Sequence, residues 1–197
     1  MNIADRITVV VVDIEATCWR SNQTPPDEKS EIIEVGVCEL DTQSGISTRK
    51  RSLLVKPTRS KVSHFCTKLT SITPDMVADG MNFADACAIL ENEYATKSRL
   101  WVSWGNFDRK IFTEQTASFG VAYPFSHAHM NIKEQYAKVE NLTKQVGMAR
   151  ALKMLDMPLT GKHHRGDDDA WNISRIMARM LRRHGRAFFE EYLDSAL

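Results

Sequence analysis

The segment Thr8-Val9-Val10-Val11-Val12-Asp13-Ile14-Glu15-Ala16-Thr17 decides the fold class of this chain. Its run of valines is typical of a strand that is buried on both faces. Asp13 and Glu15 follow at a spacing of two, so their side chains share one face of the strand, roughly 7 Å apart at Cα. Two carboxylates beside a hydrophobic sheet repel each other and are costly to desolvate, and Mg²⁺ or Mn²⁺ would remove that cost. The alternative is a strand that simply ends in polar residues.

The composition is that of a soluble globular protein with one domain, spanning residues 1–197. The chain shows no signal peptide, and no apolar stretch approaches the ~20 residues of a membrane span, so we expect no membrane association. Its net charge of +1 gives no global basic field, yet nucleic acid remains possible if basic residues surround an acidic, metal-loaded centre. Cys38 and Cys87 lie in apolar patterns typical of buried thiols, which favours a reducing, cytoplasmic location.

Hydrophobic periodicity and turn residues predict a mixed sheet flanked by helices. After the first strand, further strands are expected at 31–40, 47–55 and 100–104. Capping residues and helical spacing predict helices that begin at Thr73, Asn82 and Asn106, and others at 132–139, 147–155, 167–183 and 186–193.

A second candidate acid, Asp108, follows a short buried strand and lies near the beginning of a helix. Ile111, Phe112 and Phe119 fall on the same helix face as Asp108, which places this carboxylate on the inward side. The alternative is an acid that interacts only with the helix dipole.

A third acidic group, Asp167-Asp168-Asp169, begins the longest predicted helix. Asp169 is in phase with the apolar stripe of Ile173, Ile176, Met177 and Met180, whereas Asp168 is in phase with polar residues. Three acids at a helix start are also typical of capping and dipole residues. An unpaired carboxylate that faces the core is hard to tolerate, however, and a histidine five residues before it is a general-base candidate.

Taken in order, the three motifs resemble those of the DEDDh (DnaQ-like) 3′→5′ exonucleases. The motifs are Asp13-Ile14-Glu15-Ala16-Thr17, then Asn106-Phe107-Asp108, then His164 five residues before Asp169, followed by Asn172-Ile173. The stretch 65–73 and the pair Asn131-Ile132 resemble the KapD/Eri-type exoribonuclease branch in particular. The similarity covers most of residues 7–183, and it implies a ribonuclease-H-like α/β fold with a mixed five-stranded sheet flanked by helices.

The resemblance implies a set of site residues in this chain. The metal-binding acids would be Asp13, Glu15, Asp108 and Asp169, and His164 would be the general base. The pocket for the 3′-terminal nucleotide would be lined by Ala16, Thr17, Phe65 and Leu69. His163 and Asp168 have the same five-residue spacing, so the alternative register with His163 as the base stays open. The residues that follow, and the helical phase, favour His164 with Asp169.

The implied activity is that of a metal-dependent 3′→5′ exonuclease with two divalent cations, Mg²⁺ or Mn²⁺, about 3.5–4 Å apart. It would hydrolyse single-stranded nucleic acid, RNA or short oligonucleotides, from the 3′ end and release nucleoside 5′-monophosphates. Asp13 would bridge both cations, Glu15 and Asp169 would hold one, and Asp108 would help to position the other. The alternatives are a DNA 3′-end exonuclease on the same scaffold and a non-catalytic nucleic-acid-binding module. The motifs do not separate RNA from DNA, and they leave the oligomeric state open.

Overall fold

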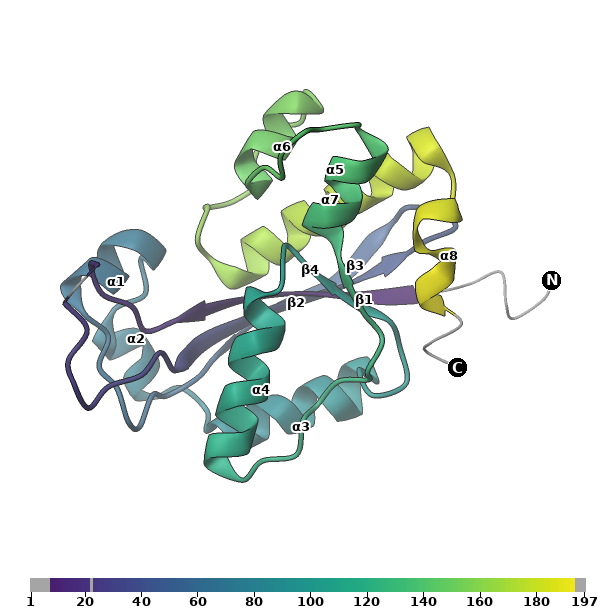
Figure 1. Ribbon diagram of the computed structural model, residues 1–197. Coiled ribbons are helices and arrows are strands. Elements are labelled where there is room, and N and C mark those ends of the chain that lie inside the picture. Colours follow the sequence, from purple (N-terminus) through teal and green to yellow (C-terminus); the bar gives the residue numbers. More distant parts are fainter. Residues whose placement is uncertain (1–7, 22, 194–197) are drawn as a thin grey trace.

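The computed structural model describes residues 8–21 and 23–193, and these form a mixed five-stranded sheet with helices on both sides (Figure 1). The strand order is β3-β2-β1-β4-β5. β1 pairs antiparallel with β2 and parallel with β4, and β4 in turn pairs parallel with β5. The bounds of the strands are Thr8–Ala16 for β1, Ile32–Asp41 for β2, Ser47–Leu54 for β3, Trp101–Ser103 for β4 and His129–Asn131 for β5.

Most helices form two layers, one on each face of the sheet, and short helices lie at its two ends (Figure 1). One layer contains α3 (Phe83–Tyr94) and α4 (Phe107–Phe119), and the other contains α5 (Ile132–Val139), α6 (Met148–Met154) and α7 (Gly166–His184). Helices α1 (His64–Thr70) and α2 (Pro74–Ala78) lie beyond the carboxyl end of β1, and α8 (Ala187–Leu193) lies at the opposite end.

The valine run in β1 forms part of the core on both faces of the sheet. Val9 and Val11 pack with side chains of α5, α6 and α7, whereas Val10 and Val12 pack with side chains of α3 and α4. Odd-numbered residues of β1 therefore face the α7 layer, because successive side chains of a strand point to opposite faces. Asp13 and Glu15 continue this odd-numbered set, so the strand directs both carboxylates toward α7.

Most predicted elements match the structure to within a residue or two at each end, and the predicted helix at 132–139 is α5 itself. The mixed sheet flanked by helices is confirmed. The resemblance implied a fifth strand, but periodicity located neither this strand, β5, nor helix α1. β5 is defined by its pairing with β4 over 3 residues, and the 7 residues of α1 show no clear apolar period. Cys38 and Cys87 are buried as predicted. No helix within the described part of the chain is long and apolar enough to cross a bilayer.

Candidate active site

Three of the four predicted acids meet where the carboxyl end of β1 faces the beginning of α7. Asp13, Glu15 and Asp169 each offer a carboxylate oxygen, and these oxygens all lie within 4.8 Å of one another. Glu15 is 8% exposed and Asp169 is 4% exposed. The helical phase deduced for Asp169 is confirmed, since Ile173, Ile176 and Met177 on the same stripe are fully buried. Asp168 is in phase with Asn172, Arg175 and Arg179, which the sequence indicates as a polar stripe. This is only partly correct, because Asn172 is fully buried, with its amide bonded to the backbone of Thr160.

Two glycines allow α7 to approach the sheet this closely. A Cβ atom at Gly36 in β2 would lie 1.8 Å from the carbonyl carbon of Gly166, the first residue of α7. A Cβ atom at Gly166 would lie 2.9 Å from the Gly36 nitrogen and 3.1 Å from the Asp13 carbonyl oxygen. The obstructing atoms all belong to backbone, so no side-chain movement could make room. This backbone contact sets how near Asp169 comes to Asp13 and Glu15.

The fourth acid, Asp108, reaches the same strand from the first turn of α4. β4 pairs with β1 only as far as Val11, and beyond that point the Ile14 N–H donates to Asp108 Oδ1 over 3.0 Å. The side chain is 4% exposed, and its charge acts on Asp13. Asp108 therefore belongs to the acidic cluster, and it also satisfies a backbone donor that the short strand β4 leaves unpaired.

Burial and mutual repulsion make this cluster costly to ionise. Burial, reinforced by Asp108, Asp169 and Glu15, holds the pKa of Asp13 well above its usual range. Burial, followed by the charges of Asp169 and Glu34, raises the pKa of Glu15 to about 8, and burial raises the pKa of Asp108 to about 6. Within the described residues, the buried Oδ1 of Asp169 has no hydrogen-bond partner. A divalent cation fits these residues, because it would bind that oxygen and offset the repulsion among the carboxylates.

The two histidines before α7 both contact Asp169, but with different atoms. His163 Nδ1 lies 2.8 Å from Asp169 Oδ2, and the His164 backbone N–H donates to the same oxygen over 3.0 Å. The two rings are stacked, with their centroids 4.0 Å apart. The hydrogen bond to Asp169 raises the pKa of His163, whereas burial and the neighbouring His163 lower the pKa of His164. His164, with φ 64°, keeps its ring free of hydrogen bonds to the rest of residues 8–21 and 23–193.

The residues predicted to line the nucleotide pocket differ in their accessibility. Phe65 is half-buried and Leu69 is 38% exposed; they lie one turn apart on α1. Ala16 is buried at the end of β1. Thr17 is fully buried, and its hydroxyl accepts from the Glu31 N–H over 2.9 Å and lies 2.6 Å from the Ser60 hydroxyl. The Thr17 side chain thus links three chain segments in this structure, while Phe65 and Leu69 present the accessible apolar surface.

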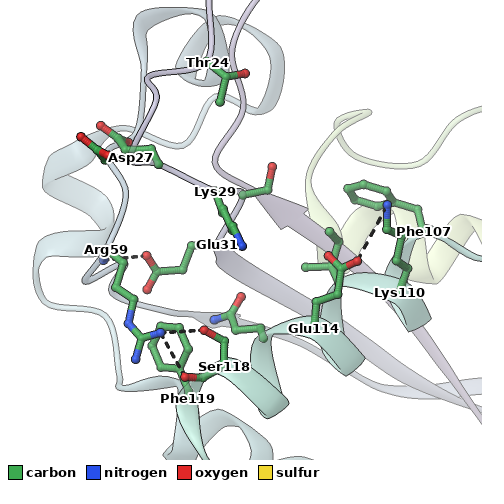
Figure 2. Close-up of a pocket in the computed structure, with 14 residues that line it drawn as sticks. Thr24, Asp27, Lys29, Glu31, Arg59, Phe107, Lys110, Glu114, Ser118 and Phe119 are labelled. Carbon is green, nitrogen blue, oxygen red and sulfur yellow. Dashed lines mark hydrogen bonds and ion pairs between the residues drawn. The ribbon is translucent and has the colours of Figure 1, made fainter.

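A hollow of about 590 Å³, which the sequence did not predict, lies between the loop at residues 24–31 and helix α4 (Figure 2). Its lining begins at Phe107, directly before Asp108, and extends along α4 to Phe119. Arg59 closes one end: it donates to Ser118 and its guanidinium carbon lies 3.8 Å from the centroid of the Phe119 ring. Acidic and basic side chains are mixed around this hollow, and the metal-ligand candidates lie outside it. Only the tertiary structure brings these segments together, so no local sequence signal predicted it.

Sequence reasoning also missed Glu34, a fully buried carboxylate on β2 whose strand register places it opposite Glu15. Glu34 lies between Ile33 and Val35 in the strand expected at 31–40, and such an alternation is equally typical of a polar face in contact with solvent. The face that carries Glu34 is covered by α7, which is why the side chain is enclosed. Lys50 on β3 was missed as well, and it forms ion pairs with both Asp167 and Asp168.

Comparisons with known proteins identify the family to which this chain belongs. A model of the RNase_T family, described as exonuclease, matches residues 10–177. The chain is 32% identical over 183 residues to the 3'-5' exoribonuclease 1 of Rattus norvegicus, covering 88% of this chain and 52% of that protein. It is 25% identical over 170 residues to the Bacillus subtilis (strain 168) protein named "Probable 3'-5' exonuclease KapD", covering 86% of this chain and 82% of that protein. This chain thus spans about half the length of the rat relative.

Among solved structures, the nuclease domain of 3'hExo bound to rAMP, described as a DEDDh family member, superposes with a TM-score of 0.82 at 28% identity. The superposition covers 91% of this chain and 94% of that domain. The resemblance deduced from the motifs is therefore confirmed. The chain belongs to the RNase_T exonuclease family and has the fold of the DEDDh nucleases.

Proposed function

We propose that this protein is a metal-dependent 3′→5′ exonuclease that hydrolyses single-stranded nucleic acid, preferably RNA, from its 3′ end. The observation that carries the proposal is the meeting of Asp13, Glu15 and Asp169, with Asp108 adjacent, at the end of β1. The family match supports the reaction class. The preference for RNA is supported by the name of the rat relative, an exoribonuclease.

The chain's own residues have distinct roles in this proposal. Asp13, Glu15, Asp108 and Asp169 would hold two divalent cations, Mg²⁺ or Mn²⁺. When bound, such cations lower the pKa of the attacking water and neutralise charge on the phosphoryl group. His164, in its neutral form, would accept the proton of that water, because burial and His163 favour the uncharged ring. Phe65 and Leu69 would contact the terminal base, with Ala16 beside them, and the buried Thr17 would support the pocket from beneath through its bonds to Glu31 and Ser60. The product would be a nucleoside 5′-monophosphate.

Digestion of 5′-labelled single-stranded RNA and DNA of matched sequence tests the activity. Each polymer is incubated with wild type or Asp13→Ala in Mg²⁺, Mn²⁺ or EDTA. We expect a ladder that shortens from the 3′ end with either metal, is faster on RNA, and is absent with EDTA or the variant. Equal or faster digestion of DNA would overturn the RNA preference. Absence of cleavage under every condition would overturn the exonuclease and favour a binding module.

The two histidines are separated by comparing His164→Ala with His163→Ala at saturating metal. Loss of a general base costs about 10²–10⁴-fold in rate. We expect that loss in kcat for His164→Ala, and a smaller loss for His163→Ala. Turnover near the wild-type level in His164→Ala, with Asp13→Ala inactive, would rule out His164 as the base. A large loss in His163→Ala alone would transfer the role to His163.

A further inference from the structure

Within the described residues, Glu34 has more hydrogen bonds than any acid of the candidate active site, and it lies beside Glu15 on the neighbouring strand β2. Its side chain is 0% exposed, and its Cα pairs with that of Glu15 across the antiparallel strands β1 and β2. Two donors come from Arg165: Nη2 lies 2.8 Å from Oε1, and Nε lies 3.2 Å from Oε2. The Gly166 N–H donates to Oε2 over 2.8 Å, and the Ser52 hydroxyl donates to Oε1.

The groups that Glu34 binds lie at the junction between the histidine loop and helix α7. Arg165 directly follows His164 and caps α7, and Gly166 is the first residue of that helix. The Arg165 carbonyl accepts the Asp169 N–H over 2.8 Å, so Asp169 lies in the first turn that Arg165 begins. A planar guanidinium bound at two points has one orientation relative to the carboxylate. The fork therefore fixes the direction in which the chain enters α7.

The contact between Gly36 and Gly166 determines the distance between α7 and β2 rather than the direction of the loop. It limits how close α7 comes to β2, because the two backbones touch there. This contact is made by backbone atoms alone, so it holds no side chain of the loop at 163–165. The Glu34 fork lies two residues along the same strand, and it holds the Arg165 side chain in one orientation.

Stability alone does not account for a charged residue at this position. Replacing a buried ion pair by apolar residues of similar volume is often neutral or stabilising. The charge of Glu34 also acts on Asp13 and Glu15 and disfavours their ionised forms. Glu34 opposes the ionisation of the metal-binding acids, yet it is tightly bound to the loop beside them. The geometry that these bonds impose on the loop explains why a carboxylate is present at this position.

We propose that Glu34 is a positioning residue: through Arg165 and the Gly166 N–H it orients the loop at 163–165, and thereby His164 and Asp169, toward Asp13 and Glu15. This inference rests on the proposed exonuclease function. Glu34 has no direct role in the reaction. Its effect passes through the residues that it holds.

The chain provides a matched control on the same strand. Glu39 is 8% exposed, and its Oε1 forms ion pairs with Arg49 over 3.0 Å and Arg99 over 2.7 Å. Glu34→Gln and Glu39→Gln each remove one arginine-paired carboxylate from β2, but Glu39 lies toward the other end of the strand. Both variants should lose thermal stability, and only Glu34→Gln should affect the site.

The first test measures kcat and KM on a 5′-labelled oligonucleotide at a temperature where both variants are folded. A misplacement of about 1 Å costs on the order of 10²-fold in rate. We expect kcat to fall about that much in Glu34→Gln with KM little changed, and to stay within twofold of wild type in Glu39→Gln. Arg165→Met should show the same loss, and the double variant with Glu34→Gln should be no worse than the poorer single variant. Equal kcat values for Glu34→Gln and Glu39→Gln, or additive losses in the double variant, would overturn the positioning role.

A second readout does not depend on activity. The imidazole resonances of His163 and His164 in the metal-free protein report the orientation of the loop by NMR, after assignment with His163→Gln and His164→Gln. They should shift in Glu34→Gln and stay unchanged in Glu39→Gln. If wild type hydrolyses neither polymer, the proposed function fails while this comparison still decides the positioning. Unchanged histidine resonances in Glu34→Gln would overturn it whatever the activity.

Discussion

The burial of Glu15 predicts that metal binding depends on pH. Burial, Asp169 and Glu34 raise its pKa to about 8, so at pH 7 the metal-free side chain is mostly protonated. A carboxylate must lose its proton to bind a cation, and binding therefore releases a proton below about pH 8. Mn²⁺ affinity should rise from pH 6 to about pH 8 as Glu15 loses its proton. Calorimetric titration in two buffers with different ionisation enthalpies measures both the affinity and the number of protons released.

Glu15→Gln is the control for this prediction. It removes the titrating group, so the affinity that remains should rise less steeply over the same pH range. An affinity in wild type that stays constant from pH 6 to pH 9 would contradict the raised pKa of Glu15.

Individual site residues were predictable to different degrees. The inward position of Asp169 follows from its phase with Ile173 and Met177, because helical period is a local property. Glu34 was not predictable in this way. A strand that alternates polar and apolar residues gives the same pattern whether its polar face meets solvent or a helix, and only the position of α7 decides that Glu34 is enclosed.

At the scale of elements, the contact between β2 and α7 predicts that Gly36 cannot be enlarged. In Gly36→Ala the new methyl group would lie 1.8 Å from the Gly166 carbonyl carbon, and only movement of the α7 backbone could relieve the overlap. Overpacking of a tight contact typically costs about 1–3 kcal/mol, and a backbone clash is at the upper end or beyond it. Urea unfolding should show that loss, and because α7 carries Asp169, the variant should also bind Mn²⁺ more weakly.

Gly147→Ala is the matched control, since a Cβ there meets nothing within 4 Å. Gly147 caps α6, where replacement of glycine by alanine costs less than about 1 kcal/mol. Equal losses of unfolding free energy in the two variants would show that the contact between Gly36 and Gly166 is looser than the structure indicates.

Elements with an apolar period or a clear start signal were predicted, including the 5-residue helix α2 with its Thr73 cap, whereas β5 and α1 were not located. α7 has 19 residues and a clear apolar stripe, so its course was evident from the sequence. β5 is defined by pairing with β4 over 3 residues, which is a tertiary interaction. α1 begins where the Ser63 hydroxyl accepts the Cys66 N–H over 3.0 Å. Ser63 was not identified as a cap from the sequence, because no clear apolar stripe follows it.

At the scale of the whole molecule, the candidate site is assembled from three elements that are distant in sequence. Asp13 and Glu15 come from β1, Asp108 from α4 and Asp169 from α7. Periodicity predicted that Asp13 and Glu15 share one face of their strand and that Asp108 and Asp169 face inward, but it did not predict that the four acids meet. That step came from the resemblance to the DEDDh exonucleases, because the order of strands in a sheet is not a local property of the sequence. The organisation of residues 1–197 as one domain remains a prediction.

A cation bound by residues of β1, α4 and α7 would stabilise the molecule as a whole. Ligand at about 100 times its Kd contributes about 2.7 kcal/mol to the folded state, and about 1 kcal/mol shifts the Tm of a chain this size by about 2–4 °C. Saturating Mg²⁺ should therefore raise the Tm of wild type by about 5–10 °C relative to EDTA in scanning calorimetry. Asp13→Asn should have a higher Tm than wild type in EDTA, because it removes one of the mutually repelling carboxylates of the cluster, and it should lose the response to Mg²⁺.

Asp156→Asn makes the same change of charge at an exposed position with φ 51°, which asparagine also adopts, and it should respond to Mg²⁺ like wild type. If wild type lacked the Mg²⁺ shift, the acids would not form a cation site in the folded chain. If Asp13→Asn kept an undiminished shift, the cation would bind elsewhere. The two results in EDTA and Mg²⁺ belong together, because the repulsion that lowers the stability of the metal-free protein is the same repulsion that the cation removes. A variant that gained stability in EDTA yet kept the full Mg²⁺ response would separate the two effects and contradict this account.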